Sequence, residues 1–380
     1  MVDDKDRQSI PIITFVLNAA LVFSLSMVVA QLTGTMEAIR FADLFQSIQS
    51  AIWMSVGILL GYAVQIFVHE LGHLLAGLLS GYTFISFRAG RLMLSIQEGK
   101  LRRTWLTVPG TMGQCLMAPP PPRNGQFPFV LYNLGGGGAN LLIGLMLLIL
   151  MIAFPWPVFV RPIGFGLVTV GIYLGITNLV PASMQGIRND GANVRALRAD
   201  EIVRQAFWAI LQISADLVAG KRLRDTSPGL YAIPTAADRT DPIICNWGAL
   251  QVSFYEDWHD FASAKRLARE WLESKGMPVV LKLELLGMMM FYDLIGDYRP
   301  DDIRRLYVTE LQRHSGGFRN SLSRLRLDYA YELLLNRDIE AARLHLQQFE
   351  TVSAEYPYKG EVQSERELIA MVDDLAYQRG

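Results

Sequence analysis

The sequence predicts a mainly α-helical, polytopic membrane core of about four spans, with a short β-hairpin between spans two and three, followed by a C-terminal α-helical domain. Two properties of the composition lead to this fold class. Of the 380 residues, 51% are hydrophobic and only 19% are charged, and the mean hydropathy is +0.24. Because soluble globular chains typically carry about 25% charged residues, some apolar segments are expected to face lipid.

Four uncharged runs supply the spans, since a bilayer core about 30 Å thick needs about 20 helical residues to cross it. The spans are expected near residues 10–32, 52–79, 129–154 and 160–180. After residue 190 charged residues become frequent, and no later apolar run is long enough to cross. The chain therefore divides into a membrane-embedded core, residues 1–198, and a cytosolic α-helical domain, residues 199–380.

The charges of the loops orient these spans. The loop 33–48 has one arginine against two acidic residues, a net charge of −1, whereas the loop 83–124 has six basic residues against one glutamate, a net charge of +5. Because positively charged loops remain in the cytosol, the second loop is expected there. With four spans, both termini are then cytosolic, and the protein is expected to be a multi-pass protein of the cell membrane.

The second span contains ionisable residues at metal-ligand spacing, His69, Glu70 and His73. Positions four apart on a helix differ by about 40° around the axis and about 6 Å along it, so both imidazoles can reach one zinc ion. Glu70 can take a proton from a zinc-bound water without binding the metal. A charge at mid-span costs about 2.5–3.5 kcal/mol, so these residues need a partner or a function. The alternative is a hydrogen-bonded polar contact between spans.

A catalytic zinc usually takes three protein ligands and a water, so two histidines leave one ligand to be found. Asp190 is the best placed carboxylate of the apolar half, because Pro181 and Gly191 make the backbone around it irregular and able to fold toward the metal. The alternative for Asp190 is a helix N-cap. One Zn²⁺ per chain, held by His69, His73 and Asp190, is the cofactor that the sequence predicts.

Three motifs together resemble a known family. They are His69-Glu-Leu-Gly-His73 in a membrane helix, Gly-Gly-Gly-Gly-Ala-Asn140 at the start of the third span, and Asn178-Leu-Val-Pro181 followed by Asp190-Gly191. Over roughly residues 50–195 the chain resembles the site-2 protease family of intramembrane zinc metalloproteases. In the commonest form of that family Asp-Gly follows the proline within a few residues, whereas nine positions separate Pro181 from Asp190 here.

The resemblance implies a role for each matching residue. The zinc ligands would be His69, His73 and Asp190, and the catalytic base would be Glu70. Substrate binding is implied for the two asparagines, Asn140 and Asn178.

The segment between the second and third spans predicts two short strands around the Ala89-Gly90 turn. A hairpin edge near the zinc would let a substrate unwind and pair as a strand, which exposes its peptide bond. The following segment, 111–122, cannot stay helical past Ala118 because four prolines follow, and it is compatible with a re-entrant or capping loop. Cys115 in this segment is expected to pack rather than to bind metal. The glycine run Gly135–Gly138 is expected to let a helix or a substrate approach closely.

Amphipathic helices are expected over the C-terminal half. Residues 329–346 resemble a tetratricopeptide-type helix pair with a turn at 336–338, although no 34-residue repeat is present. We expect a docking surface for a protein partner on this domain; the alternative is a plain α-helical domain.

Taken together, these residues favour a zinc endopeptidase that acts on a membrane-spanning or membrane-associated protein or peptide near the cytosolic leaflet. Such an enzyme serves either regulated intramembrane proteolysis or peptide maturation. The first alternative is a proteolytically inactive scaffold that presents membrane clients through the helical domain. The second is a zinc or small-solute transporter, which is disfavoured because only one span carries ionisable residues. A net charge of −1 gives no basic field for nucleic acid, so no nucleic-acid partner is expected.

Overall fold

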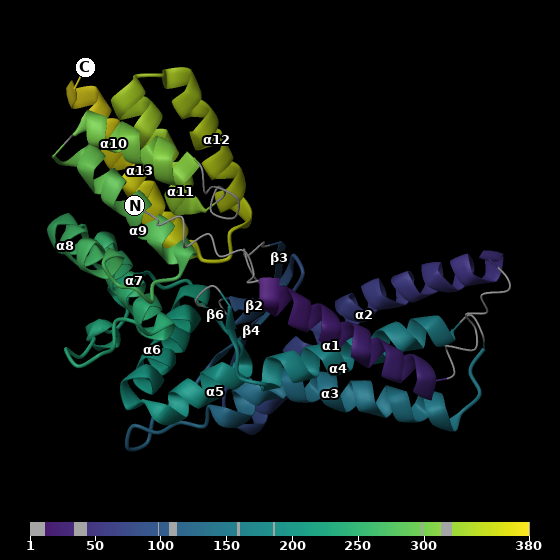
Figure 1. Ribbon diagram of the computed structural model, residues 1–380. Helices are drawn as coiled ribbons and strands as arrows, with labels where there is room; N and C mark the ends of the chain where they lie inside the picture. The colour runs from purple at the N-terminus through teal and green to yellow at the C-terminus, as the bar shows by residue number, and fades with distance from the viewer. Residues whose placement is uncertain are drawn as a thin grey trace.

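The computed structural model of the protein describes residues 12–33, 44–97, 99–105, 112–157, 160–184, 187–297, 299–312 and 321–379. Within them the fold is mainly helical, and a four-stranded antiparallel sheet lies between the early helices. Long helices extend to one side of this sheet, and a set of shorter helices lies on the other side (Figure 1). The start of the first predicted span and most of the charged loop 33–48 lie outside the described residues.

The long helices are α1 (Ile12–Leu32), α2 (Leu44–Leu79), α3 (Val130–Ala153) and α4 (Arg161–Leu179). Helices α2, α3 and α4 pack against one another, and α1 packs on α4 (Figure 1). In the described part of the chain, three helices are long and apolar enough to cross a membrane: residues 52–79 of α2, the whole of α3 and the whole of α4. These three spans are confirmed and indicate a multi-pass membrane protein. In α1 the apolar stretch found is the shorter Leu21–Leu32, so the first span stays a prediction.

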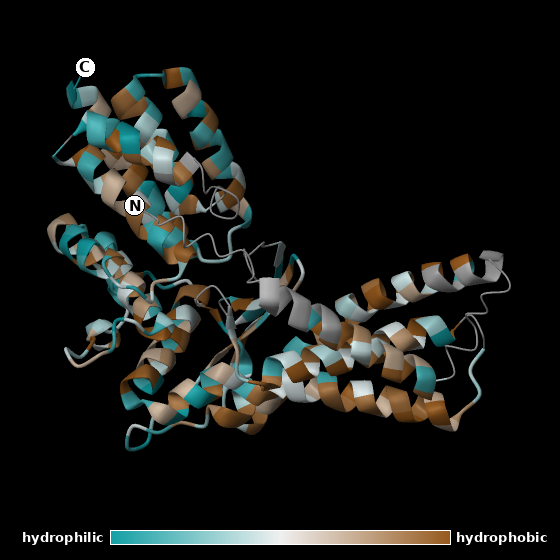
Figure 2. Ribbon diagram, viewed as in Figure 1, coloured by the Kyte–Doolittle hydropathy of each residue, from teal (hydrophilic) through white to brown (hydrophobic). Residues whose placement is uncertain are grey.

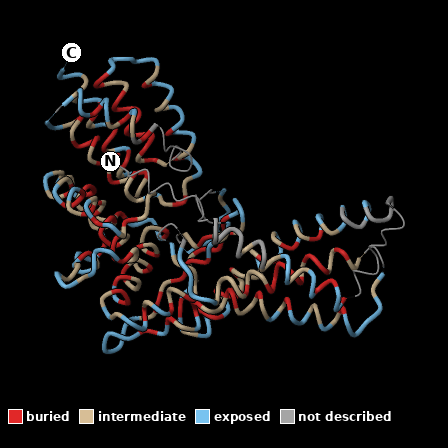
Figure 3. Tube along the Cα trace, viewed as in Figure 1, coloured by how far each residue is buried: buried red, intermediate tan, exposed pale blue. Residues whose placement is uncertain are grey.

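The outward faces of these helices carry large apolar residues: much of the helices is brown, for hydrophobic residues, in Figure 2, and many of their residues are coloured as exposed or intermediate in Figure 3. Leu59 is 71% exposed, Leu142 is 68% exposed and Ile149 is 64% exposed. A soluble protein rarely presents a continuous apolar surface of this kind, because each such side chain is unfavourable in water. The exposed face is therefore a lipid-facing surface.

Glycines allow the three spans to pack backbone against backbone. A Cβ atom on Gly166 of α4 would lie 2.1 Å from the carbonyl carbon of Gly57 in α2, and one on Gly135 of α3 would lie 2.5 Å from the carbonyl oxygen of Gly72. Any larger residue would force the helices apart at these points. For Gly135, this confirms that the glycine run serves close helix approach.

The sheet consists of β1 (Thr83–Ala89), β2 (Leu92–Gln97), β3 (Lys100–Trp105) and β4 (Gly113–Ala118) in the order β3-β2-β1-β4. The predicted hairpin is confirmed as β1 and β2, in which Ala89 pairs with Leu92. The expectation of a re-entrant or capping loop is wrong for Gly113–Ala118, which forms the edge strand. This strand pairs with β1, from Ala89 opposite Gly113 to Thr83 opposite Ala118, so it depends on hydrogen bonds to residues 24 to 35 positions earlier, which no local pattern reveals.

After the two short paired strands β5 (Ser183–Met184) and β6 (Ile187–Arg188), the regular elements of the described residues are all helices. Its elements are α5 (Asp190–Ala199), α6 (Glu201–Val218), η3 (Leu223–Asp225), η4 (Pro228–Tyr231), α7 (Pro242–Asp257), α8 (Phe261–Leu272), α9 (Val279–Ile295), α10 (Pro300–Leu306), η5 (Tyr307–Gln312), α11 (Leu322–Ala330), η6 (Tyr331–Asn336), α12 (Ile339–Glu355) and α13 (Lys359–Arg379).

The helical half is joined to the sheet rather than tethered by a linker. Helix α6 packs on β4, β1 and β2, and buried side chains from Tyr82 in the sheet region to Val372 in α13 belong to one continuous hydrophobic core. The side-chain amide of Gln97 in β2 donates a hydrogen bond of 3.2 Å to the carbonyl of Pro357, between α12 and α13. The sheet therefore connects the membrane helices to the helical half.

Candidate metal centre

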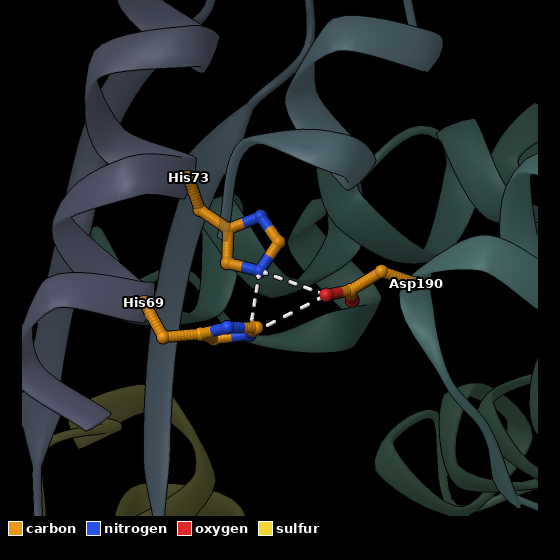
Figure 4. A group of neighbouring side chains, drawn as sticks. All are labelled: His69, His73 and Asp190. Carbon is orange, nitrogen blue, oxygen red and sulfur yellow. Dashed lines mark hydrogen bonds and ion pairs between the residues drawn. The ribbon is translucent and has the colours of Figure 1, made fainter. Parts of the chain in front are cut away.

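The two histidines of the second span lie one turn apart on α2 and point to the same side. Their Nε2 atoms are 3.1 Å apart, and Figure 4 shows both imidazoles converging on one point. His73 is 8% exposed, so it lies inside the protein rather than on the lipid-facing surface. The predicted geometry of two imidazoles that can share one ion is present.

Asp190, near the end of the predicted membrane core, reaches the same point. It is the first residue of α5, and its Oδ2 lies 3.4 Å from Nε2 of His69 and 3.4 Å from Nε2 of His73 (Figure 4). The loop before it is folded onto the end of α4, because the Asn189 side chain donates to the carbonyls of Thr177 and Val180, both at 2.6 Å.

The N-cap of α5 is Asn189, whose side-chain oxygen accepts from the backbone N–H of Ala192 at 2.9 Å. Asp190 is therefore free of the capping role that was the alternative, and its carboxylate faces the imidazoles instead. The long loop after Pro181 does not prevent this placement.

These three side chains fit a zinc ion. In a tetrahedral site with zinc–ligand distances of about 2.0–2.2 Å, ligand atoms lie about 3.3–3.6 Å apart, close to the three separations found here. The Oδ2 atom of Asp190 is buried and accepts no hydrogen bond from any residue that the structure describes, as expected of an atom kept for a metal. Two imidazoles and one carboxylate are a donor set of catalytic zinc sites. Among the described residues, His69, His73 and Asp190 form the one group of three or more His, Cys, Asp or Glu side chains whose ligand atoms all lie within 4.8 Å of one another.

The charge of Asp190 suits the same role. Burial acts to raise the pKa of this carboxyl, but the opposite effect of the two imidazoles beside it is larger. The net result is a pKa lowered to about 2. The group is therefore an anion at neutral pH, the form that binds a metal ion.

Comparison with protein-family models, with curated proteins and with solved structures yields no match for this chain.

Each histidine is oriented through its other ring nitrogen. Nδ1 of His69 lies 2.8 Å from Oδ1 of Asn140, and the Asn140 amide nitrogen donates to the Gln65 carbonyl at 2.6 Å and to the Gln65 Oε1 at 2.9 Å. Nδ1 of His73 lies 2.7 Å from the carbonyl oxygen of Tyr132. Because both partners are acceptors, each Nδ1 carries the proton, and each Nε2 keeps its lone pair for the metal.

This arrangement bears on the substrate-binding role expected for Asn140. Its side chain is fully buried, and its amide oxygen and nitrogen are both used by His69 and Gln65. The geometry supports a role in orienting a metal ligand, while direct substrate contact stays a prediction. Gln65 was missed, although a signal existed: it is a polar residue one turn before His69, on the same face of an otherwise apolar span.

Glu70 lies in the same cavity as the three ligands. This cavity has a volume of about 470 Å³, and its wall is formed by α2, α3, α4, α5, α6 and the edge strand β4. Glu70 is only 7% exposed, and a Cβ atom on Gly113 of β4 would lie 2.3 Å from its Oε1. The absence of a side chain at Gly113 therefore gives the Glu70 carboxylate its space beside the strand.

Helix α3 also leaves space for the ligands. A Cβ atom on Gly136 would lie 2.4 Å from Nε2 of His73 and 2.7 Å from Nε2 of His69, whereas a Cβ atom on Gly138 would have no neighbour within 4 Å. Within the glycine run, position 136 is thus the one that must be glycine to leave room for the two imidazoles.

Two further predicted residues line the cavity. Asn178 of α4 lies on its wall and donates to the Leu174 carbonyl at 2.9 Å, so it can meet a bound ligand. Cys115 of β4 is 7% exposed, and burial raises the pKa of its thiol to about 12. A thiol that stays protonated at neutral pH is a poor metal ligand, in keeping with the packing role expected for it.

Proposed function

We propose that this chain is an intramembrane zinc metalloendopeptidase of the site-2 protease type, which hydrolyses a peptide bond of a membrane-spanning or membrane-associated protein or peptide. The observation that carries the proposal is the group of His69, His73 and Asp190 in one cavity with Glu70, next to three apolar helices. A polar contact between spans would not need three converging ligand atoms and a separate carboxylate beside them.

The residues divide the chemistry among themselves. A zinc ion held by His69, His73 and Asp190 would polarise the scissile carbonyl and activate a water molecule. Glu70 accepts the proton of the attacking water and passes it to the departing amine. Asn140 and the Tyr132 carbonyl fix the two imidazoles, so that the ligands are arranged before substrate arrives.

The edge strand offers a way to present the substrate. Residues 112–116, which include most of β4, line the cavity beside Glu70, and β4 has a strand partner on one side only. A helical peptide bond is enclosed by its own hydrogen bonds, whereas a segment paired with β4 as a strand presents its carbonyls to the ligands. The substrate is therefore an unwound, extended segment, and Asn178 on the opposite wall is positioned to contact it.

Orientation and partners follow from the loop charges. The positive charge of the loop that contains the sheet supports a site near the cytosolic leaflet. The helical half then lies in the cytosol, where its surface can bind a protein that delivers or regulates the substrate. Regulated intramembrane proteolysis and peptide maturation both fit this arrangement.

A comparison of membrane proteomes tests the proposal. Cells with the wild-type protein are compared with cells carrying Glu70→Gln, which keeps the volume of the side chain but not its basicity. An uncut substrate should accumulate in the variant. As a matched control, Glu340→Gln alters a side chain that is 83% exposed and should leave the proteome unchanged. Identical proteomes for wild type and Glu70→Gln would favour the scaffold alternative instead.

A further inference from the structure

The outer edge of the sheet, β3, carries large apolar side chains on its surface. In the order β3-β2-β1-β4 it has a strand partner on one side only, and α2 packs on β1 and β4, at the other end of the sheet. Leu101 of β3 is 62% exposed and Trp105 is 52% exposed. Neither residue lines the cavity of the metal centre, so this edge is a separate surface.

These apolar side chains lie on the sheet face that rests on α2. The ring of Phe87 in β1 meets that of Phe67 in α2, with 5.4 Å between the centroids, and Phe87 pairs with Leu94 of β2. Paired residues share a face, and so does every second residue along a strand. The residues two positions to either side of Leu94 pair with Leu101 and Trp105, which therefore lie on this face too. Because Phe67 belongs to the span 52–79 and is 50% exposed, the face continues the lipid-facing surface of α2.

The opposite face of the sheet is occupied by the helical half. Met93 of β2 is 2% exposed and Ser95 is fully buried, and α6 packs on this strand. The large exposed apolar side chains of β2 and β3 thus gather on the α2 side of the sheet.

The two ends of β3 lie at different depths along α2. Pairing across the four strands puts Trp105 in one row with Gly113, which lies against Glu70 of α2. Glu70 precedes the end of the span 52–79 by nine residues, about 14 Å of helix. The other end of β3, at Lys100, adjoins the strand end that is hydrogen-bonded to the helical half. Trp105 is therefore level with the span, and Lys100 lies toward the end of the span.

The charges of β3 have one sign. Lys100, Arg102 and Arg103 are all exposed and form no ion pair with any residue that the structure describes. The guanidinium of Arg103 lies 6.0 Å from the ring centroid of Trp105. In the sequence from 71 to 124, Glu98 is the one acidic residue. Basic side chains next to a tryptophan beside a span are typical of a segment at an anionic membrane surface.

We propose that β3 is a lipid-binding strand: Leu101 and Trp105 enter the bilayer beside α2, and Lys100, Arg102 and Arg103 bind the phosphate groups of anionic lipids. The order along the strand fits, because tryptophan favours the boundary between hydrocarbon and headgroups, whereas basic side chains extend to the headgroups. A protein strand added to this edge would satisfy the backbone of β3 but would leave the apolar face beside α2 exposed.

Quenching of tryptophan fluorescence tests the depth of the strand. Full-length protein is placed in nanodiscs whose lipids carry bromine on the upper part of the acyl chains. Trp105→Phe should remove part of the emission that the bromine quenches. Trp258→Phe is the matched control, because Trp258 is similarly exposed, at 56%, but follows α7 in the helical half, so it should remove only unquenched emission. A Trp105→Phe variant that keeps all the quenchable emission overturns the proposal.

Lipid retention tests the headgroup contacts. Full-length protein is released from nanodiscs of phosphatidylglycerol and phosphatidylcholine, and native mass spectrometry counts the lipids that stay bound. The wild type should retain phosphatidylglycerol preferentially. The triple variant Lys100→Gln/Arg102→Gln/Arg103→Gln should lose this preference by about fivefold or more, because each basic residue near an anionic surface contributes about fivefold.

The control for the triple variant is Arg343→Gln, whose side chain is 69% exposed in the helical half and which should keep the wild-type preference. Because the three replaced side chains form no ion pair with the described residues, the triple variant should unfold at the wild-type temperature. An unchanged lipid preference in the triple variant overturns the proposal, as does a second copy of the chain retained in place of lipid.

Discussion

Nδ1 of His69 lies 2.8 Å from Oδ1 of Asn140, and this contact links a proposed metal ligand on α2 to the glycine-rich helix α3. Asn140 cannot rotate away, because its amide nitrogen donates to Gln65. The contact fixes both the ring orientation and the protonated nitrogen of His69. A residue that the resemblance assigned to the substrate thus supports the proposed metal site.

Replacing Asn140 with leucine should weaken zinc binding by about 10–100-fold, the usual effect of removing such a supporting contact. Competition with a chelator measures this affinity. Asn178→Leu is the matched control, because the Asn178 side chain donates to the Leu174 carbonyl and not to a proposed metal ligand, so its loss should leave the zinc affinity unchanged. Equal affinities of Asn140→Leu and wild type would show that the contact does not matter for the metal.

A methyl group at Gly136 should disrupt the site sterically. Because its Cβ atom would lie 2.4 Å from Nε2 of His73, Gly136→Ala should displace the imidazoles and abolish stoichiometric zinc binding. Gly138→Ala, two residues along the same helix, meets no atom within 4 Å and should keep its zinc. Measuring zinc content of both purified variants checks this, and full zinc in Gly136→Ala would disprove the tight approach.

A methyl group at Gly113 should displace Glu70, the proposed catalytic base, and leave the three proposed metal ligands in place. Its Cβ atom would lie 2.3 Å from Oε1 of Glu70, so the carboxylate must move. We expect Gly113→Ala to retain zinc and to lose at least tenfold in kcat on the substrate found by proteomics, about 1.4 kcal/mol of barrier. Undiminished hydrolysis would mean that the position of Glu70 beside β4 is unimportant.

The buried glutamates should make the helical half more stable in mild acid. Their pKa values in the folded chain, about 7 for Glu284 and Glu361 and about 8 for Glu365, lie above the ordinary 4.5. The folded state therefore binds more protons between pH 5 and pH 8, and its stability falls as pH rises through 7–8. Carboxyls with lowered pKa values, such as Asp257, titrate below this window.

Thermal unfolding followed by tryptophan fluorescence checks this pH dependence. Trp247 and Trp271 are almost fully buried in the helical half and report its unfolding. The unfolding temperature should drop from pH 5.5 to pH 8.5, and Glu284→Gln should reduce the drop. A flat or rising profile would show that these three carboxyls do not hold protons in the folded chain near neutral pH.

Much of the membrane half follows from local patterns. The charge-free runs predict α2, α3 and α4 because lipid selects length and apolarity, properties that are local in sequence. His69, Glu70 and His73 were predicted as site residues for the same reason, since ionisable residues in an apolar helix need a function. Asp190 was predicted from irregular backbone after a span, and the structure supplies what the sequence lacked, its distance to the two imidazoles.

Other features depend on partners that are distant in sequence. Strand β4 forms because it pairs with β1, and position 113 must be small because it lies against Glu70. Neither contact produces a periodic pattern in the sequence from which it could be predicted. The excess of carboxylates over guanidiniums around Arg326 likewise arises from α7, α9 and α13 meeting in space. Each helix taken singly carries ordinary surface charge.

Zinc stoichiometry tests the central claim most directly. Purified wild-type protein, freed of loosely bound metal, is compared by elemental analysis with Glu70→Gln, Asp190→Ala and the exposed control Asp374→Asn. We predict about one zinc per chain in the wild type, in Glu70→Gln and in Asp374→Asn, and almost none in Asp190→Ala, because a site with two imidazoles alone binds weakly. A wild-type protein without stoichiometric zinc, or an Asp190→Ala variant that keeps it, would contradict the metal centre proposed here.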